Sequence, residues 1–213
     1  MLTAALVGPY FIDWTNYRAQ FEAEASKILG RQVTVEGDAS ARLLPFPSVT
    51  FSDVRVAGTT PGETAMTAET FSMDAELAPL MSGEFRIFDM RLVRPHLRVA
   101  VDQNGAIDWA VRPSTPFDPH QISVEALTIT EGQVDLVHGP SGLTHSMTGL
   151  NANLSARTLA GPWRMDGTMQ LDGLPSTLSV STGAVDETGG MRLRIAGGPD
   201  SYPIAVDLDG TLK

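Results

Sequence analysis

The sequence contains no cysteine, which excludes a disulfide framework and a thiolate metal site. It is also short of positive charge, because 15 Lys and Arg residues stand against 25 Asp and Glu residues and give a net charge of −10. A nucleic-acid-binding protein needs a basic surface that displaces counterions, so this composition argues against one. Hydrophobic residues make up 42% and charged residues 19% of the 213 positions, which indicates a folded chain with a core.

Catalytic signatures are missing as well. The sequence has no G-x-S-x-G turn, no P-loop, no H-E-x-x-H pair and no Rossmann glycine fingerprint. His138 and His145 flank a Gly-Pro-Ser-Gly turn and could meet across a hairpin, but a metal site there would need further ligands. Residues 102–108 resemble a calcium loop without its final glutamate, so a hairpin turn is the better interpretation. We therefore predict no enzyme activity, catalytic residue, metal site or cofactor.

The apolar start of the chain is too short to cross a membrane. Residues 1–12 carry no charged side chain, whereas a membrane-spanning helix needs roughly 20 apolar residues. This segment either packs on the domain or is the end of a transmembrane helix that begins upstream, and we favour the second interpretation. Aromatic side chains then cluster as they do at a membrane–water interface. The predicted interface residues are Tyr10, Phe11, Trp14 and Tyr17.

Only residues 13–29 are predicted to form a convincing helix. Apolar side chains recur there at spacings of three and four, which places them on one stripe of a helix. Asp13 fits the N-cap position, and Gly30 fits the position just after the C-terminus. The predicted stripe consists of Trp14, Tyr17, Phe21, Ala25 and either Ile28 or Leu29.

Most of the remaining chain alternates apolar and polar residues, as strands with one apolar and one polar face do. A one-residue slip in this alternation predicts a β-bulge near Ser52 and Asp53. The dipeptide at 94–95 is Arg-Pro and predicts a break, because proline cannot donate to a strand ladder. The Asn-Gly pair at 104–105 predicts a hairpin turn. The alternating segments are 33–43, 49–56, 67–77, 83–101, 122–129, 134–136 and 150–154.

Three prolines in steps of three make residues 113–120 an extended, stiff connector and the best candidate boundary. Beyond it, Asp-Gly pairs at 166–167, 172–173 and 209–210 stand in similar surroundings, and each is predicted to be a turn between two strands. Repeated hairpins of this kind suggest an elongating sheet. The predicted organisation is an anchor end at 1–12, a helix with a first β region at 13–112, the connector at 113–120, and further hairpins at 121–213 that continue in a longer parent protein.

About ten to twelve strands with one apolar face have only one helix to cover them, and two architectures can solve this problem. Two sheets can close on each other as a sandwich. Alternatively, one sheet curls and leaves an apolar trough for a ligand. Large exposed apolar grooves are unusual unless they are functional, so the residue pattern alone favours the sandwich and keeps the trough as the alternative.

The order of motifs adds a resemblance to a known family. The run PYFIDWTNYRAQFEAEASKILGRQVTVEGDASARLLPFPSVTFSDVRVA resembles the N-terminal signature of the AsmA-like family of bacterial envelope proteins. The run GEFRIFDMRLVRPHLRVAVDQNGAIDW is similar to the segment that follows in that family, and GPWRMDG and YPIAVDLDG resemble its later repeats. The resemblance covers the chain from Pro9 to about Trp109 well and the remainder more loosely.

The resemblance implies a fold and a function. The implied fold is mainly β: an elongated, curled antiparallel sheet that forms a hydrophobic groove, related to bridge-like lipid-transfer proteins with chorein-type N-termini, with one N-terminal amphipathic helix. The implied location is the periplasmic side of the bacterial inner membrane, held by an N-terminal anchor. The implied role is phospholipid transfer toward the outer membrane, with an outer-membrane partner protein, in support of outer-membrane integrity. The alternative is a non-enzymatic β-sandwich that scaffolds envelope assembly through protein contacts.

On the trough hypothesis, alternating apolar residues would contact acyl chains; on the sandwich hypothesis, the same residues would form a closed core. The candidates are Val49, Phe51, Phe71, Met73, Phe85, Ile87, Leu97, Val99, Ile122, Val124, Leu127 and Ile129.

Overall fold

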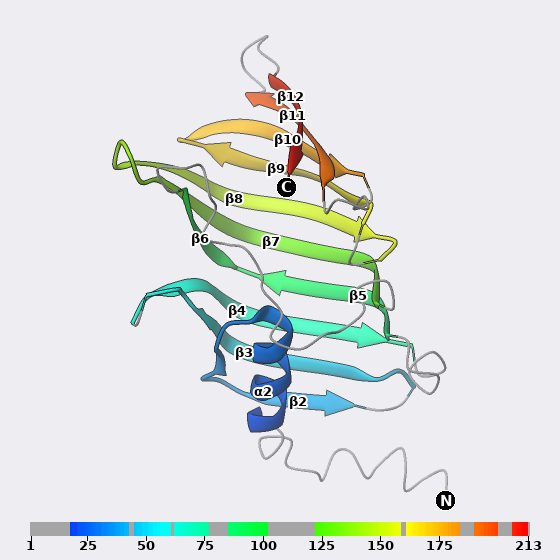
Figure 1. Ribbon diagram of the computed structural model, residues 1–213. Helices are drawn as coiled ribbons and strands as arrows, with labels where there is room; N and C mark the ends of the chain where they lie inside the picture. Colours follow the sequence, from blue (N-terminus) through cyan, green and yellow to red (C-terminus); the bar gives the residue numbers. More distant parts are fainter. Residues whose placement is uncertain are drawn as a thin grey trace, which may run out of the picture.

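The computed structural model describes residues 18–42, 45–60, 62–76, 85–101, 122–158, 161–183, 190–199 and 206–212. Within these residues the fold is mainly β with one helix, as predicted (Figure 1). The helix is α2 (Arg18–Leu29), and the predicted N-cap at residue 13 lies outside the described residues. The strands are β1 (Val33–Val35), β2 (Ala39–Arg42), β3 (Ser48–Ala57), β4 (Thr64–Ala75), β5 (Phe85–Val93), β6 (His96–Val101), β7 (Ile122–His138), β8 (Leu143–Ala156), β9 (Trp163–Leu171), β10 (Leu174–Thr182), β11 (Met191–Pro199) and β12 (Val206–Leu212).

All of these strands belong to a single 12-stranded sheet in the order β1-β3-β4-β5-β7-β8-β9-β10-β11-β12, in which β2 also pairs with β3, and β6 pairs with β4 and β7. The described strands therefore form the curled sheet and not two facing sheets of a sandwich. Strands on both sides of residues 113–120 pair directly, because β5 and β6 contact β7. The division of the chain into separate segments at this connector stays a prediction.

The sheet is antiparallel as predicted, except where β5 and β6 meet β7. Both of those pairs are parallel. Strands β5 and β6 follow each other between β4 on one side and β7 on the other, so they act as one long strand interrupted at Arg94 and Pro95. This is the break that the Arg-Pro dipeptide predicted. A parallel pair needs a long crossover connection, and the Asn-Gly pair at 104–105 in that connection lies outside the described residues.

The strands bend along a line that crosses the sheet. Asp53 in β3, Arg94 between β5 and β6, and Glu131 in β7 have φ angles of 52°, 47° and 53°, and Gly149 in β8 has a φ of 59°. An irregularity is present at the predicted place, since Asp53 has a positive φ angle, but the additional residue is on the opposing segment: residues 36–38 lie opposite only Ser52 and Asp53, while β3 keeps its register with β4 there. Bulges bend a strand and increase its twist. Repeated on β3, β5–β6, β7 and β8, they bend this part of the sheet.

A second line of irregular pairing runs parallel to the first. Register shifts occur beside Ala75 in the β4–β5 pair and between Val124 and Leu127 in the β7–β8 pair. Between the two lines lies the regularly paired middle of the sheet. The sheet is thus bent on both sides of a central strip, which is the geometry of a trough.

Helix α2 covers one face of the sheet near the β1 edge (Figure 1). The Phe21 ring stacks on Phe51 with ring centroids 3.8 Å apart. The Val33 N–H donates to Ser26 Oγ at 2.8 Å, and the Val35 N–H donates to Glu22 Oε1 at 2.6 Å. An edge strand otherwise leaves such donors unpaired. The helix therefore packs Phe21 on the sheet and also satisfies the edge of β1, whereas Ile28 is exposed and does not belong to the packed stripe.

The Asp-Gly pairs correct one prediction. Only Asp172 and Gly173 form a turn, with φ angles of 48° and 85°, between β9 and β10. The pairs at 166–167 and 209–210 lie inside β9 and β12. At Gly167 the reason is space: a Cβ atom would lie 2.6 Å from the backbone oxygen of Asn151. Glycine is needed there for close strand approach, not for a turn.

Candidate functional site

The register of the sheet aligns apolar residues into rows that cross the strands. Register partners on neighbouring strands share one face. One row passes through ten strands from β2 to β12 and meets an apolar residue at every register position. Its members are Ala41, Val49, Met73, Met90, Leu127, Leu154, Met165, Val180, Ile195 and Leu208.

A second row lies two residues further along each strand, on the same face. It contains only apolar residues and glycine: Ala39, Phe51, Phe71, Leu92, Ile129, Ala152, Gly167, Leu178, Gly197 and Val206. We call the surface formed by these two central rows and the rows that flank them the apolar trough.

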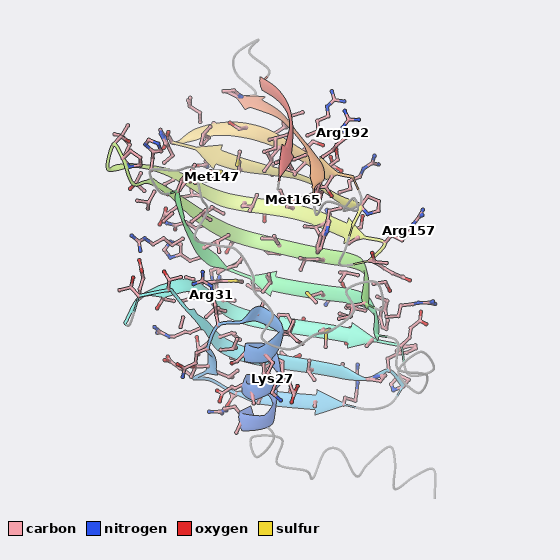
Figure 2. The ribbon with its side chains drawn as sticks, viewed as in Figure 1. Lys27, Arg31, Met147, Arg157, Met165 and Arg192 are labelled. Carbon is pink, nitrogen blue, oxygen red and sulfur yellow. The ribbon has the colours of Figure 1, made fainter. Side chains whose placement is uncertain are left out.

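Two further apolar rows flank the centre beyond the lines of bulges. The first comprises Ala75, Ile87, Val124, Ala156 and Trp163. The second comprises Val33, Val56, Met66, Leu97, Val134, Met147, Leu171 and Leu174, and its Met147 is labelled with Met165 of the central row in Figure 2.

The opposite face of the sheet is polar. The row next to the central one contains Ser40, Thr50, Ser72, Arg91, Thr128, Asn153, Asp166, Ser179, Ala196 and Asp207. Only one of its members, Ala196, is apolar. Along these rows, the sheet thus has a polar face and an apolar face.

The trough is covered unequally. Phe51 is only 5% exposed beneath Phe21 of α2. Further along the central row, Leu127, Leu154, Met165 and Val180 are half-buried. In the part of the chain that the structure describes, α2 is the only helix, and it packs at the β1 end. These four side chains beyond β4 stay partly exposed, whereas Ala152 of the second central row and Ile87, Val124 and Ala156 of a flanking row are buried.

The sequence-predicted trough residues are brought together on this face. Val49, Met73 and Leu127 lie in one central row, and Phe51, Phe71 and Ile129 lie in the other. The remaining predicted residues lie in or beside the flanking rows: Ile87, Val124, Ile122, Leu97 and Val99, while Phe85 is placed only by its backbone pairing with Ile122. Their contact with lipid stays a prediction. The predicted interface residues Tyr10, Phe11, Trp14 and Tyr17 lie outside the described residues.

Sequence reasoning missed most of the two central rows of the trough. Met90, Leu92, Leu154, Met165 and Val180 occupy the same rows but were not among the candidates. Apolar and polar residues alternate through 163–182, and this alternation could have identified Met165 and Val180 as residues of one apolar face. The strand register, which sequence alone does not supply, is what joins these residues into continuous rows.

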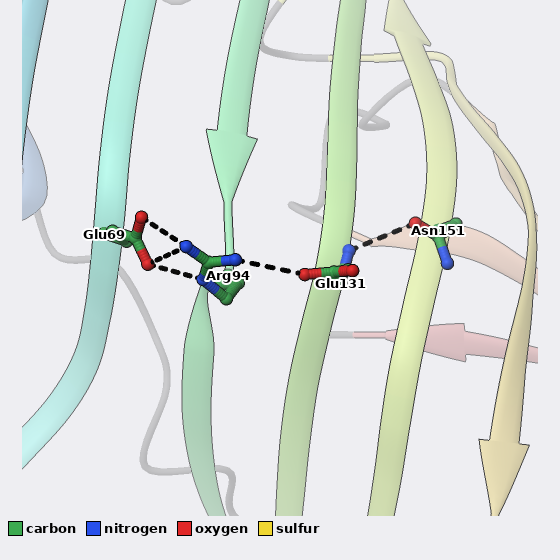
Figure 3. A network of polar contacts seen from close by, with 4 residues as sticks. All are labelled: Glu69, Arg94, Glu131 and Asn151. Atoms are coloured by element: carbon green, nitrogen blue, oxygen red, sulfur yellow. Dashed lines mark hydrogen bonds and ion pairs between the residues drawn. The ribbon is translucent and has the colours of Figure 1, made fainter.

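A polar network crosses the sheet along the first line of bulges (Figure 3). Arg94 forms a bidentate hydrogen bond with Glu69 of β4, in which Nε and Nη2 donate to the two carboxylate oxygens. Its Nη1 lies 3.3 Å from Glu131 Oε2 of β7. The Glu131 N–H donates to Asn151 Oδ1 of β8 at 3.1 Å. The hydrogen bond to Glu69, reinforced by its charge, raises the pKa of Arg94 above the ordinary value. This network links four neighbouring strands where their backbones are irregular.

A second polar cluster lies on β6, β7 and β8. His96 Nε2 is 2.7 Å from Asp135 Oδ2, and Ser146 Oγ donates to Asp135 Oδ1 at 2.8 Å. The hydrogen bond with His96, followed by that from Ser146, holds the pKa of Asp135 below its ordinary value. The carboxylate stands between the imidazole and the hydroxyl, so the imidazole does not contact the hydroxyl as a general base would. This cluster is a structural link between strands.

The histidines considered as a metal pair have separate partners. His138 Nδ1 lies 2.6 Å from Ser141 Oγ, and His145 Nδ1 lies 3.3 Å from Asp172 Oδ2. No group of three metal-binding side chains occurs among the described residues. In the same part of the chain, no helix is both long enough and apolar enough to cross a membrane.

The family model of the AsmA family matches residues 1–139, from the apolar start through the end of β7. The chain belongs to the AsmA family. No curated protein matches the sequence. The matched region contains α2 and the first seven strands, and the apolar rows of this AsmA-family chain continue without a break into β8 to β12. Membership of the AsmA family fits a function in the cell envelope.

Proposed function

We propose that this AsmA-family chain carries the acyl chains of phospholipids in its apolar trough, and that it makes or breaks no covalent bond. It would act on the periplasmic side of the bacterial inner membrane, tethered by an N-terminal anchor, and move lipid toward a partner protein at the outer membrane. The observation that carries this proposal is the central row that stays apolar through ten strands.

The dimensions of the trough suit an acyl chain. Neighbouring strands lie roughly 4.8 Å apart, so a row across ten strands extends for roughly 43 Å. One bilayer leaflet has a hydrocarbon depth of roughly 15 Å. The row is therefore longer than one acyl chain, and a lipid has several equivalent positions along it.

Movement along the row meets no charged side chain. Each methylene group removed from water contributes about 0.8 kcal/mol, and that contribution is similar at every apolar register position. A lipid can then shift from strand to strand at little cost, while its headgroup remains in water. Transfer of this kind needs a continuous apolar surface and no catalytic residue.

The test is to purify the chain from bacterial membranes and to quantify co-purified phospholipid by mass spectrometry. Leu154→Asp places a charge in the central row, where a lipid chain would have to desolvate it, and should lower bound phospholipid by about tenfold or more. Asn153→Asp puts the same side chain on the exposed polar face of the same strand and should leave bound lipid unchanged.

Circular dichroism of both variants would show whether the sheet remains folded. A well-folded wild-type chain that holds no lipid, or a folded Leu154→Asp variant that holds as much as the wild type, would contradict the proposal.

A further inference from the structure

The apolar face of the sheet continues outward to the side where the β7–β8 and β9–β10 hairpins turn (Figure 1). Beyond the flanking row that contains Met147, two more rows lie on the same face. They contain only apolar residues and two histidines: Val99, Leu136 and His145 in the first, and Val101, His138 and Leu143 in the second. The trough therefore has an apolar margin on this side of the sheet.

Three large apolar side chains of this margin are exposed. Leu143 is 59% exposed, Leu174 is 44% exposed and Leu171 is 36% exposed. Leu171 and Leu174 end the row of Met147 at the β9–β10 turn, and Leu143 lies on the same face because an even number of residues separates it from Met147 on β8. We call Leu143, Leu171 and Leu174 the lip. Exposed apolar side chains that gather in one place mark a contact with a protein or a membrane.

Hydrogen bonds join the two hairpins beside the lip. The Asp172 N–H donates to the Ser146 oxygen at 3.2 Å, and the Ser146 N–H donates to Asp172 Oδ1 at 3.4 Å. His145 Nδ1 lies 3.3 Å from Asp172 Oδ2. The β9–β10 turn is thereby attached to β8, so the lip is one surface and not two independent loops.

The lip stands in a part of the chain with little charge. Residues 138–145, which include the β7–β8 turn, contain no Asp, Glu, Lys or Arg. Residues 169–177, which include the β9–β10 turn, contain only Asp172, whose carboxylate contacts His145 and Ser146. A surface that enters an apolar medium must not carry unpaired charges with it, because their desolvation is costly. These two turns meet that condition in a chain that has 25 acidic and 15 basic residues.

A bilayer fits the lip better than a protein does. A stable interface between proteins involves roughly 20–30 residues on each side. Its energetic centre is enriched in Trp, Tyr and Arg, and Leu is under-represented there. The lip offers three leucines at two turns. Charge also disfavours a second copy of the chain, because each copy has a net charge of −10 and the two would repel each other.

We propose that the lip inserts into the outer part of a phospholipid bilayer and that the trough receives lipid across it. This inference rests on the proposed function and names the surface at which the trough meets a membrane. The lip shares the face of the central rows. From Leu171, an acyl chain reaches Met165 of the central row by way of Met169 and Gly167 of the same strand, without passing a charged side chain on that face.

The test uses the lack of cysteine, which allows one labelled position at a time. In the whole chain, Leu174→Cys carries an environment-sensitive fluorophore at the lip, and the labelled protein is mixed with phosphatidylcholine vesicles. We expect a blue shift of the emission and quenching by phospholipids brominated on their acyl chains. Thr177→Cys places the same label on the exposed polar face of the same strand and should show neither effect. Because the signal is local, insertion of another part of the chain does not produce it.

A second substitution shows whether the lip itself drives insertion. Leu143→Asp should reduce the fraction of inserted label by about tenfold, because the burial of a leucine is lost and a carboxylate would have to be desolvated. Asn153→Asp adds the same charge to the exposed polar face of β8 and should leave the quenching unchanged. Neither substitution alters the central rows, so both variants should take up phospholipid from detergent micelles at the wild-type level.

No shift with Leu174→Cys, or a shift that Leu143→Asp leaves unchanged, would overturn the lip as a membrane contact, and lipid uptake from micelles would show that the trough function stands. If the wild-type chain takes up no lipid from micelles, the proposed function fails, and with it the claim that the trough receives lipid across the lip. A dimer in sedimentation velocity that Leu143→Asp dissociates would mean that a second copy covers the lip, which would also overturn the inference.

Discussion

Gly167 shows how one missing side chain controls the spacing of β8 and β9. A Cβ atom at this position would lie 2.6 Å from the Asn151 oxygen and 2.7 Å from the Ala152 Cβ atom. Gly167→Ala should therefore lower the free energy of unfolding by about 1–3 kcal/mol, because the strands would have to separate. Denaturant unfolding followed by circular dichroism measures this change.

The sequence provides a matched control for Gly167, because Gly210 stands in the same Asp-Gly-Thr tripeptide in β12. A Cβ atom there would meet nothing within 4 Å. Gly210→Ala should change stability by less than about 0.5 kcal/mol. Equal losses in the two variants would show that close strand approach is not the cause.

Asp135 makes the stability of the fold depend on pH. Its pKa is lowered in the folded state, chiefly by the hydrogen bond with His96. A lowered folded-state pKa contributes stability above the ordinary value of about 3.9, and this contribution disappears as the pH falls below it. Asp135→Asn should therefore cost about 1 kcal/mol at pH 7 and progressively less as the pH approaches 3. Urea midpoints of both proteins at several pH values test this, and a difference that stays constant with pH would contradict it.

At the scale of elements, the contact between α2 and β1 protects one edge of the sheet. Two backbone donors of β1 are satisfied by side chains of α2, at Ser26 and Glu22. Ser26→Ala leaves the Val33 N–H without its acceptor, and we expect a loss of about 1 kcal/mol with faster hydrogen exchange at Val33. Exchange in β7 should not change.

The control for this edge is Ser40→Ala, which removes an exposed hydroxyl on the polar face of the neighbouring strand β2. It should leave the exchange of Val33 at its wild-type rate. If Ser26→Ala behaves like Ser40→Ala, the helix covers β1 without stabilising its edge.

The interrupted strand β5–β6 lies on the first line of bulges. Arg94 has a positive φ angle and contacts carboxylates on both neighbouring strands, β4 and β7 (Figure 3). A side chain that bridges both neighbours stabilises the strands at the point where backbone pairing is interrupted. The backbone is not left unpaired there, because the Arg94 N–H donates to the Thr130 oxygen at 2.8 Å.

At the scale of the whole molecule, one sheet carries two surfaces of different polarity. The apolar rows run from β2 to β12 on one face, and a mainly polar row accompanies them on the other. Because the strands run across the row direction, each strand adds about 4.8 Å of trough. Lengthening such a sheet by hairpins lengthens the apolar path without changing its cross-section.

The sequence by itself determined the class of each element. Alternation through residues such as Phe71, Met73 and Leu127 requires strands with one apolar face, and the slip after Phe51 requires a bulge, because side-chain direction in a strand has a period of two. The stripe containing Phe21 and Ala25 requires a helix. These features are local, so a window of a few residues contains the whole signal.

Only the tertiary structure decided between trough and sandwich. The same alternation suits both architectures, and the choice depends on which strands pair and in which register. Pairing of Met90 with Leu127, in parallel, and of Leu154 with Met165 joins residues from distant segments into one row. Arg86, Arg157 and Arg164 likewise line one cavity only because the start of β5, the end of β8 and the start of β9 lie on one side of the sheet. Such contacts are made between segments far apart in sequence, so no local pattern contains them.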